Sequence, residues 1–127
     1  MGGDNAPDEI IKGCVEAVKA KDGFDVELIG VESEIGRVLQ KYHYPQNRIT
    51  IIPASQAITN EDKPTEAIRH KKDSSLVVGL NRLKENLGHV FVTAGSTGAL
   101  LAGTLLIAGR IPGVLRPALA PIVPSIA

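Results

Sequence analysis

Residues 90–106 of the chain read VFVTAGSTGALLAGTLL and combine three local signals. Val90, Phe91 and Val92 are β-branched or aromatic, which predicts a short buried strand. Residues 93–98 are small, with three hydroxyls and two glycines, a composition typical of a turn. Residues 99–108 are apolar on every side of a helix, so we expect a helix that lies inside the protein.

The turn has the composition of an anion site. A strand, a glycine-rich turn and a helix start together present free backbone N–H groups at the positive end of the helix dipole. Gly95, Ser96, Thr97 and Gly98 would supply those groups. The spacing matches neither a Walker loop nor a dinucleotide fingerprint. Taken alone, the turn is equally well explained as a plain connection between a strand and a helix.

Composition excludes several function classes. The 127 residues suit one domain, and 14 basic residues balance 14 acidic ones, so no strong field favours nucleic acid. A single cysteine excludes an internal disulfide and agrees with a reducing setting. We see no signal peptide, and the longest apolar run is shorter than the roughly 20 residues that a membrane span needs. The composition is that of a cytoplasmic α/β enzyme.

Helix and strand signals alternate along the chain. The spacing predicts strands at Phe24–Gly30, Ile49–Pro53 and Ala118–Ala127. It predicts further helices that begin after Pro7, at Ser33, at Pro64 and at Ser74 or Ser75. Their expected N-caps are Asp4 or Asn5, Ser33, and Asp73 or Ser74, and Gly88 is expected to end the last of them.

This order favours a three-layer α/β fold with a mostly parallel sheet and helices on both faces. Too few strands are present for a complete doubly wound sheet, so we expect a truncated chain.

Three segments carry residues that suit anion binding: Gly2–Pro7, Lys63–Ser75 and Thr93–Gly98. In open α/β sheets, ligands bind at the carboxyl ends of strands, where such loops gather. The middle segment supplies cations and hydroxyls at Lys63, Arg69, Lys71, Lys72, Ser74 and Ser75. A solvated helix end followed by a helix cap explains this segment slightly better when no family is considered. Arg116 is either an anion ligand or part of a turn.

Other reactive residues are weaker candidates. Cys14 falls on an apolar helix face and is interpreted as a core residue. His43, His70 and His89 do not have the spacing of metal ligands, so we expect no metal site. The chain also lacks the nucleophile elbow of hydrolases.

Four segments carry motifs in a fixed order. Residues 1–7 (MGGDNAP) match the second half of D-A-M-G-G-D-x-A-P, and residues 63–75 (KPTEAIRHKKDSS) match K-P-x-x-A-x-R-x-K-x-D-S-S. Residues 93–99 (TAGSTGA) are similar to S-A-G-N-T-G-A, and residues 116–119 (RPAL) match R-P-A-L. Together they resemble the PlsX family, the phosphate acyltransferases of bacterial phospholipid synthesis. Two departures are Asn60, where methionine is common, and Ser96, where asparagine is usual.

The resemblance implies a fold like that of the isocitrate and isopropylmalate dehydrogenases, and a homodimer. It also implies that residues 1–127 are the N-terminal part of a single larger catalytic domain. We expect this piece alone to be inactive.

The implied reaction transfers a fatty acyl group from acyl carrier protein to inorganic phosphate and gives acyl phosphate. Phosphate is itself the nucleophile, so no activated side chain and no cofactor are required. The resemblance assigns catalytic roles to Asp4, Asn5 and Lys72. It assigns binding roles to Gly2, Gly3, Lys63, Arg69, Ser74, Ser75, Gly95, Ser96, Thr97, Gly98 and Arg116.

Two alternatives stay open. One is an enzyme like phosphate acetyltransferase, which would use a coenzyme A thioester as donor. The other is a non-catalytic module that binds an anionic metabolite. The full-length enzyme is expected in the cytoplasm, with peripheral association at the inner face of the membrane as a further possibility that the sequence leaves open.

Overall fold

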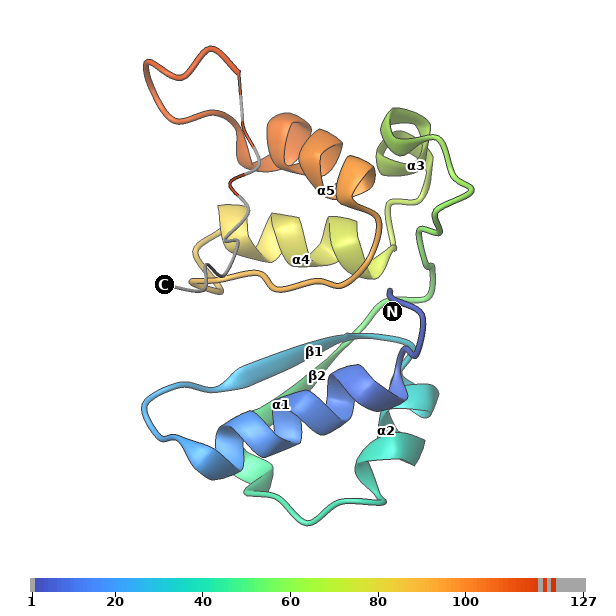
Figure 1. Cartoon of the computed structure of the whole chain (residues 1–127), viewed down its shortest axis with the longest axis vertical. Coiled ribbons are helices and arrows are strands. Elements are labelled where there is room, and N and C mark those ends of the chain that lie inside the picture. The colour runs from blue at the N-terminus through green and yellow to red at the C-terminus, as the bar shows by residue number, and fades with distance from the viewer. Residues whose placement is uncertain (1, 117, 119, 121–127) are drawn as a thin grey trace, which may run out of the picture.

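The computed structural model of the chain describes residues 2–116, 118 and 120. Figure 1 shows two parts, with the strands, α1 and α2 in one and α3, α4 and α5 in the other. The elements are α1 (Asp8–Ala20), β1 (Val26–Gly30), α2 (Glu32–Leu39), the 3₁₀ turn η1 (Gln46–Arg48), β2 (Ile49–Pro53), α3 (Pro64–His70), α4 (Ser75–Lys84), α5 (Thr97–Gly103) and the π turn η2 (Thr104–Ala108).

The strands form a small parallel sheet. β1 and β2 pair in register from Val26 opposite Ile49 to Gly30 opposite Pro53, and α2 makes the crossover between them. Parallel strands need such a crossover, because a tight turn would make the second strand antiparallel to the first. The α/β class and the parallel sheet are confirmed. The three-layer, dehydrogenase-like arrangement stays a prediction.

One core lies between the sheet and the helices α1 and α2. Ile11, Val15 and Val18 point from α1 toward Leu28 of β1, and Val38 of α2 is fully buried beside them. Burying each such side chain contributes about 1.5–3 kcal/mol. Cys14 is partly buried and packs against this core, as predicted, and burial raises the pKa of its thiol.

Arg48 ties the end of α1 to the start of β2. Its guanidinium donates to the carbonyl oxygens of Val18 and Lys21 at 2.8 and 3.0 Å, and it lies over the ring of Phe24. Carbonyls at a helix C-terminus have no partner within the helix, so a cation there satisfies them.

A second core fills the helical part. Ile68 of α3, Leu76 and Leu80 of α4, and Ala99 of α5 are all buried in it. Helix α5 sits close to the other two helices because Gly103, which is buried, presents no side chain to them.

The two parts are joined by backbone pairing and by an ion pair. Gln56, just after β2, donates its N–H to the Asp73 carbonyl at 3.0 Å and accepts from the Ser75 N–H at 3.2 Å. From the helical part, Arg82 of α4 donates its Nε–H to Glu27 of β1 at 2.7 Å. A guanidinium that binds a carboxylate through two nitrogens fixes orientation as well as distance.

The predicted strand at Val90–Val92 is wrong for the structure observed. The segment forms no strand within residues 2–116, and Val90 and Val92 are 79% and 87% exposed. Only Phe91 turns inward, where its ring packs against the second core next to Gly79. A β-branched sequence favours extension, but a strand also needs a neighbour to accept its hydrogen bonds.

The expectation of an apolar helix inside the protein holds for one face only. The helix begins at Thr97, two residues before the predicted start, and changes to a π turn at Thr104. Ala99 is fully buried, whereas Leu105 and Leu106 are 37% and 53% exposed. Residues around a helix point in all directions, so a neighbour on one side covers only one face.

Several predicted helix ends differ from the structure. Pro7 and Val31 occupy the N-cap positions of α1 and α2, in place of Asp4 or Asn5 and of Ser33. Helix α4 ends at Lys84, before Gly88, while its predicted cap at Ser74 is confirmed. The predicted strand at Ala118–Ala127 lies outside the described residues, apart from 118 and 120.

Replacing Gly103 by alanine is expected to destabilise the protein, against the usual trend in helices. Alanine favours a helix over glycine by about 0.5–1 kcal/mol. A Cβ at Gly103, however, would lie 2.6 Å from Leu80 Cδ1 and 3.0 Å from Leu76 Cδ2. Since overpacking costs about 1–3 kcal/mol, the free energy of unfolding should fall, as measured by urea titration.

Gly13→Ala in α1 is the matched control. No heavy atom lies within 4 Å of a Cβ built there, so only the helix preference acts. The free energy of unfolding should then rise by about 0.5–1 kcal/mol. Equal effects of the two substitutions would contradict this account of the packing around α5.

Candidate functional site

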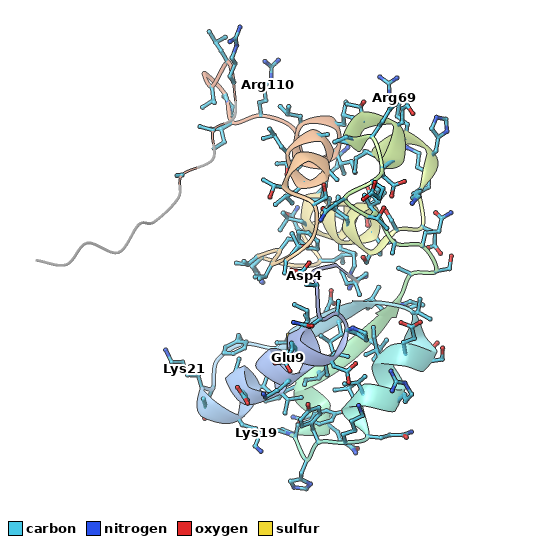
Figure 2. All side chains as sticks on the ribbon, turned by 45° about the vertical axis from the view of Figure 1, so that its right-hand side comes forward. Asp4, Glu9, Lys19, Lys21, Arg69 and Arg110 are labelled. Atoms are coloured by element: carbon cyan, nitrogen blue, oxygen red, sulfur yellow. The ribbon has the colours of Figure 1, made fainter. Side chains whose placement is uncertain are left out.

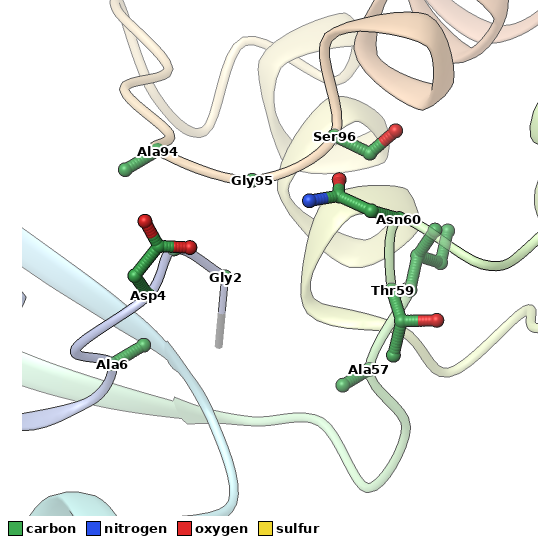
Figure 3. Close-up of a pocket in the computed structure, with 11 residues that line it drawn as sticks. Gly2, Asp4, Ala6, Ala57, Thr59, Asn60, Ala94, Gly95 and Ser96 are labelled. Atoms are coloured by element: carbon green, nitrogen blue, oxygen red, sulfur yellow. The ribbon is translucent and has the colours of Figure 1, made fainter.

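An open pocket of about 320 Å³ lies where three loops meet. Figure 3 shows the N-terminal loop, the loop after β2 and the turn before α5 around it. Its lining residues are Gly2, Gly3, Asp4, Ala6, Ala57, Ile58, Thr59, Asn60, Ala94, Gly95 and Ser96.

Two of these loops touch through their backbones. A Cβ built on Gly2 would lie 2.8 Å from the Gly95 Cα, closer than real atoms approach. Gly3 has a φ of 102°, a conformation that side chains disfavour, and faces Ala94. The structure therefore brings the first and third predicted segments together at this pocket. The second meets the third at Gly98, where a built Cβ would lie 3.1 Å from Pro64 Cγ, but it lends the pocket no lining residue.

The polar side chains of the pocket come from all three walls. In Figure 3 the Asp4 carboxylate points toward the Ala94–Gly95 segment, and the Asn60 amide extends toward Gly95 from the opposite wall. Ser96 also lines the pocket, but its hydroxyl points away from Gly95 and caps α5. Asp4 is the one charged side chain among the lining residues of the described chain. The pocket thus offers one negative group together with neutral donors and acceptors.

The backbone N–H groups of the turn are only partly available to a ligand. Gly95 donates its N–H to Thr93 Oγ1 at 3.1 Å, and Ala99 donates to Ser96 Oγ at 3.4 Å. Within the part of the chain that the structure describes, the N–H groups of Thr97 and Gly98 find no acceptor, as is usual in a first helical turn. The predicted set of N–H donors therefore loses Gly95.

The third wall, Ala57–Asn60, was not among the predicted site segments. It follows β2, and loops after parallel strands gather at the same edge of a sheet. That rule, applied to the strand predicted at Ile49–Pro53, would have pointed to these residues. Residues 57–60 carry no charged side chain, so their composition gives no local sign of an anion site.

The second predicted segment contributes no cation to the lining of the pocket. Lys63 occupies the N-cap position of α3 without a side-chain cap bond and pairs with Glu66 at 3.4 Å, while Arg69 and Lys72 are exposed. Figure 2 shows Arg69 at the far end of the helical part, pointing away from Asp4. None of these residues lines the pocket, and neither does the exposed Arg116.

Three further predicted residues support the backbone near the pocket without lining it. Ser74 is fully buried and accepts from the Val77 N–H at 3.4 Å, so its role as a helix cap is confirmed. Ser75 donates its N–H to Gln56. The Asn5 carbonyl accepts from the Glu9 N–H at 3.2 Å at the start of α1.

The described residues contain no group of three or more His, Cys, Asp or Glu side chains that could hold a metal ion. No helix among them is long and apolar enough to cross a membrane.

Comparison with known proteins agrees with the four sequence motifs. A family model described as "Fatty acid synthesis protein" matches residues 1–127. The chain belongs to this family. Proteins named phosphate acyltransferase from Acetivibrio thermocellus, Alkaliphilus oremlandii and Halothermothrix orenii are 54%, 53% and 46% identical to it over 125 residues. The resemblance to phosphate acyltransferases is confirmed.

The match covers this chain and its relatives unequally. Each alignment covers 98% of this chain but 37% of the relative. The chain therefore spans little more than a third of the length of these family members. The described pocket is formed by that third alone.

Asp73 gives a test of how the loop after β2 is fixed. Its Oδ2 accepts from the Ser55 hydroxyl at 2.5 Å and from the Ser55 N–H at 2.8 Å, and these bonds lower the pKa of Asp73 below its usual 3.8. In a Ser55→Ala variant the pKa of Asp73 should rise toward 3.8, measured by carboxyl ¹³C NMR titration.

The sign for stability follows from the lowered pKa. Ionised Asp73 stabilises the fold above pH 3.8, and that contribution is lost as the pH falls through the lower pKa of the folded state. The stability difference between the wild type and Asp73→Asn should therefore shrink under acid conditions. A difference that stays constant down to full protonation would contradict the hydrogen-bonding role of Asp73.

Proposed function

We propose that the chain forms part of the active site of an enzyme that transfers a fatty acyl group from acyl carrier protein to inorganic phosphate. The product is acyl phosphate, a precursor for phospholipid synthesis. One observation carries the proposal: Gly2 and Gly95 meet in backbone contact at a small pocket that includes polar side chains, in a chain whose relatives are named phosphate acyltransferases. Backbone that lacks side chains lets a small anion approach closely.

The reaction makes one bond and breaks one. A phosphate oxygen attacks the thioester carbonyl carbon, the carbon–sulfur bond breaks, and the leaving thiolate takes up a proton. The protein must orient phosphate against the carbonyl and stabilise the negative charge that develops on its oxygen. The Asn60 amide is placed to donate a hydrogen bond for these tasks.

Asp4 would act on the proton that phosphate carries. Inorganic phosphate near neutral pH keeps at least one P–O–H group, and a carboxylate can accept its hydrogen bond. As phosphate attacks, Asp4 takes this proton and serves as general base. Sulfate has no such proton, so the Asp4 carboxylate would repel it. A negative side chain in the pocket is thus compatible with a phosphate substrate.

The cations of the second segment would act at longer range. Lys63, Arg69 and Lys72 do not line the pocket, but exposed positive charge raises the local concentration of an anionic substrate. We therefore assign Arg69 and Lys72 to attraction of phosphate. Asn5 would hold the loop that carries Asp4.

Further parts of the proposal concern the whole protein. We propose that it is a homodimer in the cytoplasm, with peripheral contact to the inner face of the membrane where its product is used. The alternative donor is a coenzyme A thioester, as in phosphate acetyltransferases. Comparing the two donors directly in one assay decides between them. A non-catalytic module would bind phosphate but transfer no acyl group from either donor.

Asp4→Asn in a full-length protein that carries this chain tests the proposed base. We expect kcat to fall by about 10²–10⁴-fold, the usual contribution of a general base. Sulfate should inhibit the variant more strongly than the wild type, because the repelling charge is gone. The measurement is formation of acyl phosphate from acyl–acyl carrier protein and phosphate.

Glu16→Gln removes an exposed carboxylate from α1 and is the control for a change in net charge. It should leave both kcat and sulfate inhibition unchanged. If Asp4→Asn keeps wild-type kcat, Asp4 is not the base.

Arg69→Ala and Lys72→Ala test the long-range role of the cations. Each should raise the KM for phosphate about two- to threefold at low salt, with a smaller effect near 0.5 M salt, where charges are screened. An effect that does not depend on salt would instead favour direct contact with phosphate.

A further inference from the structure

The pocket wall Ala57–Asn60 is irregular, so something other than a helix or sheet ladder must hold it. Lys71, the first residue after α3, performs this task from behind the wall. Its Nζ donates to the Ala57 carbonyl oxygen at 2.9 Å and to Asp62 Oδ2 at 2.6 Å. Asp62 Oδ2 in turn accepts from the Thr59 N–H at 2.8 Å and the Thr59 hydroxyl at 3.2 Å.

The wall is therefore anchored at three successive residues. Lys71 holds the carbonyl of Ala57, the buried side chain of Ile58 enters the second core, and Asp62 holds Thr59. Asn60 follows immediately and carries the amide that reaches toward Gly95. Neither Lys71 nor Asp62 lines the pocket.

The pair is better placed than an ordinary surface ion pair. The Lys71 and Asp62 side chains are 32% and 24% exposed, so solvent reaches them only in part. The hydrogen bond from Lys71 is the main cause of a lowered pKa at Asp62, which keeps that carboxylate charged. Hydrogen bonds between charged groups are shorter and stronger than those between neutral ones.

We propose that Lys71 and Asp62 are positioning residues, which fix the Ala57–Asn60 wall so that the Asn60 amide faces the Gly95–Ser96 turn. This inference rests on the proposed function, since it gives the wall a role in binding phosphate. The pair acts before substrate arrives, because a site already in its bound shape loses less freedom on binding. It touches neither substrate nor the reacting atoms.

The test uses Lys71→Met and Asp62→Asn in a full-length protein that carries this chain. With acyl–acyl carrier protein as donor, each variant should raise the KM for inorganic phosphate about tenfold, because small displacements of positioning groups are costly. The value of kcat should stay within about threefold. Lys71→Arg, which keeps the charge and can reach both acceptors, should restore most of the phosphate affinity.

Lys84→Met at the exposed end of α4 is the matched control for loss of one lysine, and it should leave KM and kcat unchanged. The double variant of Lys71 and Asp62 should be little worse than either single one, since each change breaks the same anchor. A purely structural role would lower the melting temperature and leave the KM for phosphate unaltered. That result would overturn the proposal.

Amide hydrogen exchange separates this inference from the proposed function. The Thr59 N–H is bonded to Asp62, so its exchange should be about tenfold faster in Asp62→Asn, while amides in α1 keep their wild-type rates. If the wild type transfers no acyl group to phosphate, the proposed function fails. The exchange rate at Thr59 still tests whether Asp62 holds the Ala57–Asn60 wall. Unchanged exchange at Thr59 would refute it.

Discussion

The short backbone pairing between Gln56 and the segment Asp73–Ser75 sets the relation between the sheet and the helical part. Gln56 follows β2 closely and comes directly before the loop Ala57–Asn60, which lines the pocket. Because both partners are backbone, the pairing fixes direction and register at once. The ion pair between Glu27 and Arg82 joins the same two parts at another point. The pocket depends on this junction, since its walls come from both sides of it.

Local sequence signals were sufficient where a neighbour in the chain decides the structure. The bounds of β2 were predicted correctly, and the cap at Ser74 needed only the helix that follows it. The strand predicted at Val90–Val92 failed because a strand depends on partners elsewhere, which a local pattern cannot reveal. Likewise, nothing in the apolar sequence predicts the π turn after Gly103.

The candidate site shows the same division. The two glycine loops were predicted because glycine and small polar residues directly indicate a turn in the backbone. The cationic residues were selected for their charge, and chemistry alone does not say which way a side chain points: Arg69 lies far from Asp4. The loop Ala57–Asn60 was missed for the opposite reason, since its contribution is one of shape and of neutral polar groups.

The contact between Gly2 and Gly95 limits how this chain can change during evolution. In most packed pairs, a larger residue on one side can be balanced by a smaller one on the other. Here both partners already have the smallest side chain, so no such exchange exists. A Cβ on Gly2 would lie 2.8 Å from the Gly95 Cα, whereas one on Gly95 would lie at an ordinary contact distance of 3.6 Å from the Gly2 Cα. The constraint therefore falls on Gly2, independently of any ligand. Drift at Gly2 should be slow even in descendants that lose the ancestral activity but keep the fold.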